Sequence, residues 1–506
     1  MPLIRILTHK APEDLKDRTA IGKTAVVGIV IILVAVGGVG AYFAYSSYTA
    51  PASTTTTTSS TASQTTASQT VTTLSVPNVP EAMIQAFYPA TPITINEYAW
   101  SGYPLPGAVQ SFEAAFPNIH VNQSPNEDLS GLLSALETRQ YVYDSFRIQY
   151  FQLPQEVATG EVMNIAPWFN QYLSALSSQI SPSALALVSA GQAGKTYCIP
   201  EDFGPVAFAY RQDLFTKYGL TVPQTWAQFQ SDAQKLHSEN SSITMTVFPP
   251  NEPSADLMGL FWAQGGNMIV PVNSTAYNVE INSTTNLNVI NYWGNLINAH
   301  EVQAINLYTP QFNQELAGSE IASFVTAAAW YPRYVIQAVA PQQSGLWRIS
   351  NMPQNSTSSF TTGVVGGSCM GVTANAKYPG PSFLFAYFST QTPQVLPYMW
   401  TQGGQWTSNS YYLQNLAYSN GTKVFLSNSS YFGGENIGQV YLKSQQSAGT
   451  QWQWSPYQIT LMLIMQEQLT EAAAGQITFT QALQNTETIM ISYIQSNGGI
   501  VASVGH

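Results

Sequence analysis

The chain has 506 residues, of which 45% are hydrophobic, 12% are aromatic and only 8% are charged, against a usual charged share of about 25%. This much apolar material can bury a large core, which excludes intrinsic disorder for most of the chain. The net charge of −11, with only 16 basic residues, argues against nucleic-acid binding, and two cysteines exclude a cysteine-built metal site.

An uncharged apolar segment follows the basic N-terminus. Residues 24–45 are long enough, at about 1.5 Å per helical residue, to cross a hydrocarbon core of about 30 Å. Basic residues precede this segment, and the next one is Arg139. The positive-inside rule therefore predicts a cytoplasmic segment over 1–23 and a transmembrane helix or signal anchor over 24–45. Removal of the leader by cleavage stays open, and the main body lies outside the cell in every case.

A Ser/Thr-rich stretch with few large apolar residues follows over 46–90. It cannot build a core, so the sequence predicts a disordered, O-glycosylated or plain linker that acts as a stalk. Seven N-x-S/T sequons agree with an extracellular glycoprotein and begin at Asn122, Asn240, Asn273, Asn282, Asn355, Asn420 and Asn428.

Residues 91–506 alternate between strand and helix patterns. A strand over 93–98, a helix over 109–116 and a second strand over 119–121 predict a βαβ unit with ligand loops at the carboxyl ends of its strands. Further helices are expected over 129–139, 225–237, 289–299, 381–390 and 455–474. The predicted fold class is α/β.

The stretch from Ala193 to Trp226, AGKTYCIPEDFGPVAFAYRQDLFTKYGLTVPQTW, resembles the signature of extracellular solute-binding proteins of sugar ABC transporters. Further similar segments follow the family's order: FEAAFPNIHV at 112–121, WAQGG at 262–266, LAGSEIA at 316–322, VGGSCMGV at 365–372 and FLFAYFST at 383–390. With the apolar segment and the stalk, the chain resembles the membrane-tethered, maltose-binding-protein-like receptors of archaea.

The resemblance implies a two-lobed, periplasmic-binding-protein-like fold with hinge strands. The first lobe would comprise 91–200 and 368–402, and the second 201–367 and 403–506. The crossing strands would lie near 197–205 and 366–372, with Cys198 on one and Cys369 on the other. Outside the cytoplasm such a pair is expected to form a disulfide, and two buried free thiols are the alternative.

The expected site is a cleft that holds a sugar, because Trp and Tyr cover the apolar face of a sugar ring while polar groups bind its hydroxyls. The candidate residues are Trp100, Gln149, Glu201, Asp202, Trp262, Gln264, Trp330, Gly367, Ser368 and Trp406. For each aromatic residue, ordinary packing is the alternative. The chain contains no HExxH or GxSxG motif, so no catalytic residue, metal or cofactor is predicted.

The predicted function is sugar capture, as a monomer, for the permease subunits of an ABC importer. A surface-anchored glycosidase is the main alternative and would need two carboxyl groups about 5–9.5 Å apart. A receptor for oligopeptides or another solute also remains possible.

Overall fold

A computed structural model describes residues 74–100, 106–127, 129–139, 143–251, 257–356, 361–401, 404–415 and 430–505. The predicted cytoplasmic segment, transmembrane helix and most of the stalk lie outside these residues. Among the helices of the described ranges, none has the length and apolar character that a membrane crossing requires.

The folded part begins earlier than residue 91, where the sequence predicted it. Helix α3 (Glu81–Phe87) lies within the predicted linker. Met83 and Ile84 of this helix are buried, as are Val76 and Val79 before it. These few apolar residues pack against the core through α14, which explains why the end of a Ser/Thr-rich stretch is ordered.

The first sheet has five strands in the order β2-β1-β3-β12-β4. Their bounds are β1 (Ile93–Trp100), β2 (Ile119–Glu127), β3 (Ser145–Gln149), β4 (Cys198–Pro200) and β12 (Ser368–Val372). β1 is parallel to β2 and β3, which confirms the predicted βαβ unit, whereas β12 is antiparallel to its neighbours β3 and β4. The strand that completes this sheet therefore comes from a distant part of the chain.

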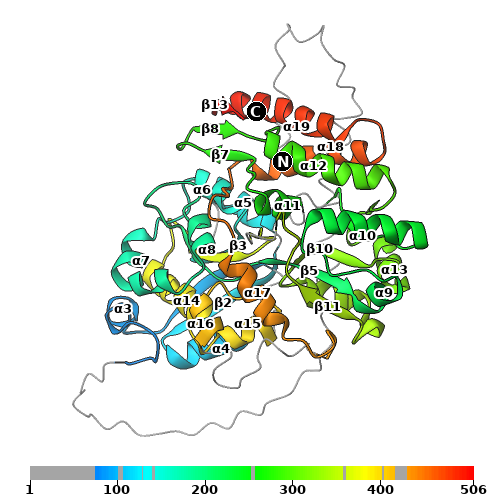
Figure 1. The fold of residues 1–506 in the computed structure, drawn as a ribbon. Coiled ribbons are helices and arrows are strands. Elements are labelled where there is room, and N and C mark those ends of the chain that lie inside the picture. The colour runs from blue at the N-terminus through cyan, green and yellow to red at the C-terminus, as the bar shows by residue number, and fades with distance from the viewer. Residues whose placement is uncertain are drawn as a thin grey trace, which may run out of the picture. The chain divides into compact units, whose positions relative to one another are not determined.

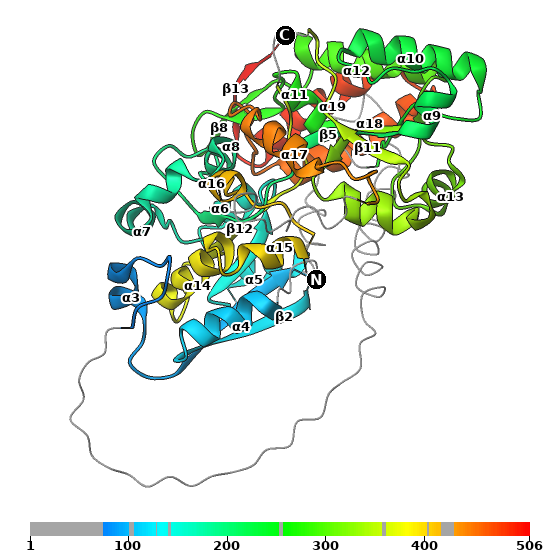
Figure 2. The same ribbon diagram turned by 60° about the horizontal axis from the view of Figure 1, so that its bottom comes forward.

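Helices cover this first sheet (Figures 1 and 2). They are α4 (Pro106–Ala115), α5 (Leu129–Thr138), α6 (Leu153–Ala158), α7 (Ala166–Tyr172), η2 (Ser174–Ser178), α8 (Pro182–Leu187), α14 (Pro379–Gln391) and α15 (Leu396–Thr401). Helix α14 is buried on nearly every side and packs against β12, β3, α3 and α4. An all-round apolar helix of this kind forms the centre of a lobe.

The second lobe contains three smaller sheets, in the orders β10-β5-β11, β13-β8-β7 and β6-β9. Their strands are β5 (Val206–Arg211), β6 (Val247–Phe248), β7 (Ile269–Pro271), β8 (Ala276–Val279), β9 (Gln303–Ala304), β10 (Ser323–Ala328), β11 (Trp347–Ser350) and β13 (Ile500–Val504). Every residue of β5 and β10 is buried, including the polar residues Arg211, Ser323 and Thr326.

The second lobe also contains helices, some of which begin at a Thr or Ser side-chain cap. They are α9 (Gln212–Lys217), α10 (Trp226–Glu239), α11 (Met258–Ala263), α12 (Thr284–Asn298), α13 (Pro310–Gly318), η4 (Pro332–Gln337), η5 (Pro341–Gln343), α16 (Ser410–Asn415), α17 (Ile437–Gln446), α18 (Gln458–Ala473) and α19 (Phe479–Ser496). Thr225 with Gln228, and Thr478 with Gln481, form capping boxes at the starts of α10 and α19. The helices predicted from the sequence are confirmed, with ends that differ by a few residues.

Three segments, 201–205, 362–367 and 404–409, lie side by side, and the first of them connects β4 of the five-stranded sheet to β5. The backbone N–H of Val365 donates to Gly204 at 2.8 Å, and that of Phe203 donates to Trp406 at 2.7 Å. We call these the first, second and third crossing segments. Beside them, Cys198 of β4 and Cys369 of β12 form a disulfide with Cα atoms 5.6 Å apart, as predicted.

Candidate functional site

Trp330 lies against the second crossing segment. It follows β10 directly, and its indole Nε1–H donates to the carbonyl of Val365 at 3.1 Å. A Cβ atom added to Gly366 would lie 3.4 Å from the same nitrogen, so the ring lies close to the backbone. The ring is only half-buried, and the Tyr331 ring supports it at 4.6 Å between centroids. A half-exposed tryptophan therefore lies against the second crossing segment.

Arg333 and Tyr334 extend this surface toward the third crossing segment. Both belong to the short π-helix η4, and the guanidinium of Arg333 lies 5.9 Å from the ring of Tyr334. The Nη1 of Arg333 donates to the carbonyl of Trp400 at 2.9 Å. Gly404 has φ +60°, and a side chain there would collide with Arg333, so a glycine permits this close approach. Tyr334 is 36% exposed and available to a ligand.

Asp202 is the acidic group of this cluster and lies on the first crossing segment. Burial and the Asp202 carboxylate raise the pKa of the Tyr150 phenol, and burial and Asp202 also outweigh Arg333 in raising that of Tyr334. Both phenols are therefore neutral at physiological pH and can donate or accept hydrogen bonds. The Tyr150 hydroxyl donates to the Asp202 carbonyl at 3.1 Å, and its ring leaves space only for glycine at 367, where φ is +95°.

Glu201, the neighbour of Asp202, has a different environment. Its carboxylate is fully buried and accepts from the Nε of Arg147 at 3.0 and 3.1 Å. The Nη1 of the same arginine donates to Glu97 of β1, which is also fully buried. Neighbouring residues on an extended segment point to opposite sides, so Asp202 and Glu201 do not share one face. We therefore leave Glu201 out of the binding residues proposed below.

A single arginine of the first lobe lies between two buried carboxyl groups, and this cluster makes the folded protein more stable at acidic pH. Burial raises the pKa of Glu201 to about 7, with Asp202 and Glu97 adding to the rise and Arg147 opposing it, and burial also raises the pKa of Glu97. The folded protein thus binds a proton that the unfolded chain releases near pH 4.5. This contribution to stability is complete below that pH and is lost as the pH rises through about 7.

We expect Glu201→Gln to flatten the pH dependence of stability. In the unchanged protein, one such proton makes the free energy of unfolding fall with rising pH by at most about 1.4 kcal/mol per pH unit. Glu201→Gln cannot bind that proton, so its free energy of unfolding falls less steeply between pH 5 and 7. Urea unfolding at several pH values measures this pH dependence. The matched control is Glu239→Gln, because Glu239 is an exposed residue of α10. A decline equally steep in Glu201→Gln and the unchanged protein would contradict this assignment.

The remaining predicted site residues fall into two groups. Gln149 and Ser368 pair with each other across β3 and β12, next to Gly367. Trp406 belongs to the third crossing segment and is buried, and its Nε1 donates to the Oε1 of Gln445 at 2.6 Å. Trp100 is the last residue of β1 and pairs with Glu127. Trp262 and Gln264 do not join these residues. Trp262 is buried and stacks on Trp452 at 5.5 Å, and Gln264 lines a separate pocket of the second lobe.

Arg333 and Tyr334 were not among the site residues predicted from the sequence. A local signal for them exists, because residues three and four positions after Trp330 return to the same face of a helical turn. Read in this way, the run WYPRY at 330–334 indicates one surface that carries an indole, a guanidinium and a phenol.

The model of the bacterial extracellular solute-binding protein family matches residues 98–388, more than half of the chain. The chain belongs to this family. The search of curated proteins found no match to this chain.

Solved structures share the fold of the solute-binding protein at low sequence identity. The galacto-N-biose/lacto-N-biose I-binding protein of an ABC transporter from Bifidobacterium longum has a TM-score of 0.69 and 20% identity, with 82% of this chain and 100% of that chain covered. An ABC transporter-associated binding protein from B. animalis subsp. lactis, in complex with β-1,6-galactobiose, has a TM-score of 0.67, 20% identity and coverage of 82% and 100%. A sugar-binding protein from Xanthomonas citri has a TM-score of 0.66, 14% identity and coverage of 80% and 98%. These similarities establish the two-lobed α/β fold.

Proposed function

We propose that the solute-binding protein captures a sugar between its lobes and delivers it to the permease of an ABC importer. The observation that carries this proposal is the half-exposed Trp330 against the second crossing segment, with Asp202 and Tyr334 nearby. Family membership supports it, as do the sugar ligands named for the structures from Bifidobacterium longum and B. animalis.

Each group of this cluster has a role in sugar recognition. The Trp330 ring covers the apolar C–H face of one sugar unit, as aromatic rings do in carbohydrate sites. Asp202 accepts hydrogen bonds from hydroxyl groups, while Arg333 donates and the neutral Tyr334 phenol does either. The proposed site is completed by Trp100, Gln149, Gly367 and Ser368. Trp406 is buried and packs behind these residues.

Capture uses the geometry of the crossing segments. We assign 91–200 with 368–402 to the first lobe and 201–367 with 403–506 to the second, so that bending at the crossing segments closes one lobe on the other. A ligand favours the closed form only through its higher affinity for that form. Trp330 and Arg333 lie in the second lobe and Gln149 in the first, so a bound sugar contacts both.

The segments before residue 74 fit the same function. A transmembrane helix over 24–45 and an extended stalk would hold a monomeric receptor outside the cell beside its permease. Tethering raises the effective concentration of the receptor at the permease without any additional contact. Limited proteolysis of intact cells, read by release of the receptor, tests the tether independently of binding.

Trp330→Ala is expected to weaken sugar binding at least tenfold, because the variant loses the surface that covers the sugar ring. A thermal-shift screen of mono- and oligosaccharides first finds the ligand, since a ligand at 100 times its Kd adds about 2.7 kcal/mol of stability. Calorimetric titration then compares the variant with the unchanged protein. Trp168→Ala is the matched control, because Trp168 is another half-buried tryptophan and lies on α7.

Unchanged affinity in Trp330→Ala would remove this residue from the site. Analysis of the sugar after incubation separates the receptor from the glycosidase alternative, because a receptor returns its ligand intact. Binding of oligopeptides with no binding of any sugar would assign the protein to another class of cargo.

A further inference from the structure

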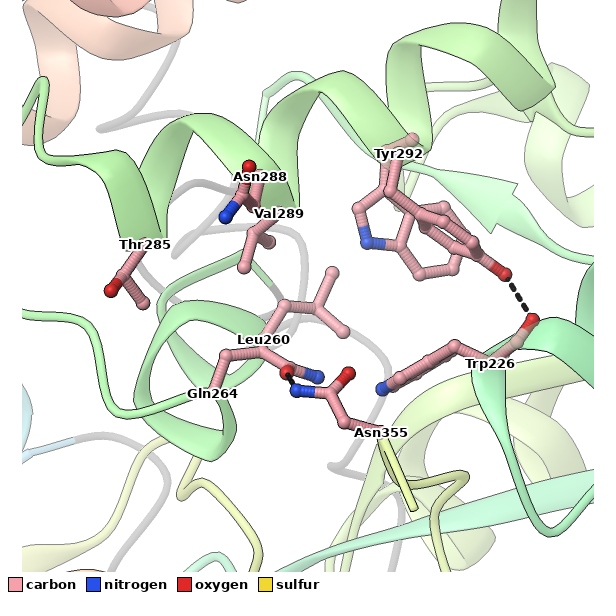
Figure 3. Close-up of a pocket in the computed structure, with 9 residues that line it drawn as sticks. Trp226, Leu260, Gln264, Thr285, Asn288, Val289, Tyr292 and Asn355 are labelled. Carbon is pink, nitrogen blue, oxygen red and sulfur yellow. Dashed lines mark hydrogen bonds between the residues drawn. The ribbon is translucent and has the colours of Figure 1, made fainter.

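The second lobe has a pocket of about 370 Å³ that is separate from the crossing segments (Figure 3). The described residues that line it come from the start of α10, from α11, from α12 and from the chain near 355. They are Trp226, Leu260, Gln264, Thr285, Asn288, Val289, Tyr292, Trp293 and Asn355. The volume lies within the range of about 300–1,000 Å³ that is usual for small-molecule sites.

The lining combines an apolar base with a polar rim. Leu260, Val289 and the rings of Trp226, Tyr292 and Trp293 supply apolar surface, whereas Thr285 contributes a hydroxyl and three residues contribute amides. No carboxylate, lysine, arginine or histidine is among the described lining residues. A pocket of this kind has no counter-charge for an ion, so its ligand is uncharged and carries both C–H surface and hydrogen-bonding groups.

Trp226 supplies a second, independent observation. Its side chain is only 8% exposed, and its indole Nε1 has no hydrogen-bond partner among the residues that the structure describes. Figure 3 shows this nitrogen pointing toward the pocket, on the side of Asn355. The carbonyl of the same residue is satisfied, because the Tyr292 hydroxyl donates to it at 2.8 Å. A buried donor without an acceptor costs about 1–3 kcal/mol, which a hydroxyl oxygen in the pocket would offset.

The Gln264 and Asn355 amides form one edge of the pocket. The Nδ2 of Asn355 donates to the Oε1 of Gln264, as the dashed line in Figure 3 marks. The same two residues also line a neighbouring pocket of about 220 Å³, which Gln354, Thr361 and Gln451 line as well. The amide pair therefore lies between the two pockets, and amide side chains line both of them.

We infer that the second lobe carries an additional binding site for an uncharged sugar, in the pocket between α10, α11 and α12. One hydroxyl oxygen of the sugar accepts from the Trp226 Nε1, and the amides of Asn288, Gln264 and Asn355 bind further hydroxyls. The C–H face of the sugar rests on Leu260, Val289 and the Tyr292 ring. This site shares no residue with the cluster at Trp330, so it does not depend on the proposed function.

Fluorine NMR of the full chain labelled with 5-fluorotryptophan tests both sites in one sample. Trp226→Phe and Trp330→Phe each remove one resonance and so assign the two reporters. The protein is produced in a host without N-glycosylation, because Asn355 begins a sequon. The probes are maltose, lactose and N-acetyllactosamine, with N-acetyl-trialanine amide as the peptide probe. We expect the Trp226 resonance to shift saturably with at least one disaccharide, also in Trp330→Ala.

A matched pair of variants on α12 tests the rim. Asn288 lines the pocket, whereas Asn295 is equally exposed on the same helix and does not. Asn288→Leu is expected to weaken the binding that the Trp226 resonance reports by about two- to tenfold, the range of one hydrogen bond, and Asn295→Leu is expected to leave it unchanged.

Each other outcome has a definite meaning. If disaccharides shift the Trp330 resonance but not that of Trp226, the additional site is refuted while the proposed function stands. A Trp226 shift with the capped tripeptide alone refutes the assignment to sugars. A shift of Trp226 without one of Trp330 upholds the additional site and counts against the proposed function, and no shift of either resonance refutes both.

Discussion

Replacing both Cys198 and Cys369 by serine is expected to lower the free energy of unfolding by about 2–5 kcal/mol. The disulfide joins residues 171 positions apart, so it closes a long loop in the unfolded chain. Loop-entropy arguments place such a bridge at the upper end of the range. The bridge also holds β4, an edge strand of three residues whose only partner among the described strands is β12. Urea unfolding followed by circular dichroism measures the loss.

Reduction of the unchanged protein should lower the midpoint in the same way. The double-serine variant is the control, because a reductant can have no effect on it through this bond. Equal midpoints for the oxidised and reduced protein would show that the bond adds nothing to stability. A change in the slope of the urea transition would point instead to a more compact unfolded state of the bridged chain.

Arg147→Met is expected to cost about 3–5 kcal/mol at neutral pH, the usual effect of removing one partner from a buried ion pair. Arg147 is 1% exposed, and it is the cation that Glu97 and Glu201 share. Methionine can still pack against the Phe385 ring, which lies 6.0 Å from the guanidinium carbon, so the loss reflects charge more than space. Unfolding of the variant and of the unchanged protein at pH 7 and pH 4.5 measures this loss of stability.

The loss should be smaller at the acidic pH. Without the arginine, both carboxyl groups bind protons more readily, and neutral carboxyls are less costly to bury than carboxylates. Combining Arg147→Met with Glu97→Gln and Glu201→Gln is the control, because it removes all the charges together and should restore much of the stability. An equal loss at both pH values would mean that packing, not charge, accounts for the effect.

The sequence was sufficient for the elements whose signals are local. The βαβ unit over 93–127 and the helices α10 and α18 follow from apolar periodicity and turn residues, and all of them are present. Helix α3 was missed because it has only seven residues and directly follows the stalk, and its place in the fold depends on contacts with the distant α14. The two-lobed arrangement came from resemblance, since periodicity does not indicate which lobe a strand joins.

The candidate site was harder to predict, because membership of the site depends on the direction in which a side chain points, and position in the chain does not give that direction. Asp202 and Glu201 are neighbours in sequence, yet one lies beside the phenols at the crossing segments and the other binds Arg147. Trp262 and Trp330 both follow elements of the second lobe, but the Trp262 ring is stacked in the core. The group formed by Glu97, Arg147 and Glu201 joins residues 50 and 54 positions apart, a pairing that one sequence alone does not reveal.

The position of β12 sets the order in which the protein can be assembled during synthesis. This strand lies inside the first sheet, between β3 and β4, although more than 160 residues separate it from β4 along the chain. When β4 leaves the ribosome, β12, its neighbour in the sheet, has not yet been made. The first lobe must therefore wait, incomplete, until most of the second has been translated. A chain truncated before residue 368 should accordingly remain open to proteases in both halves.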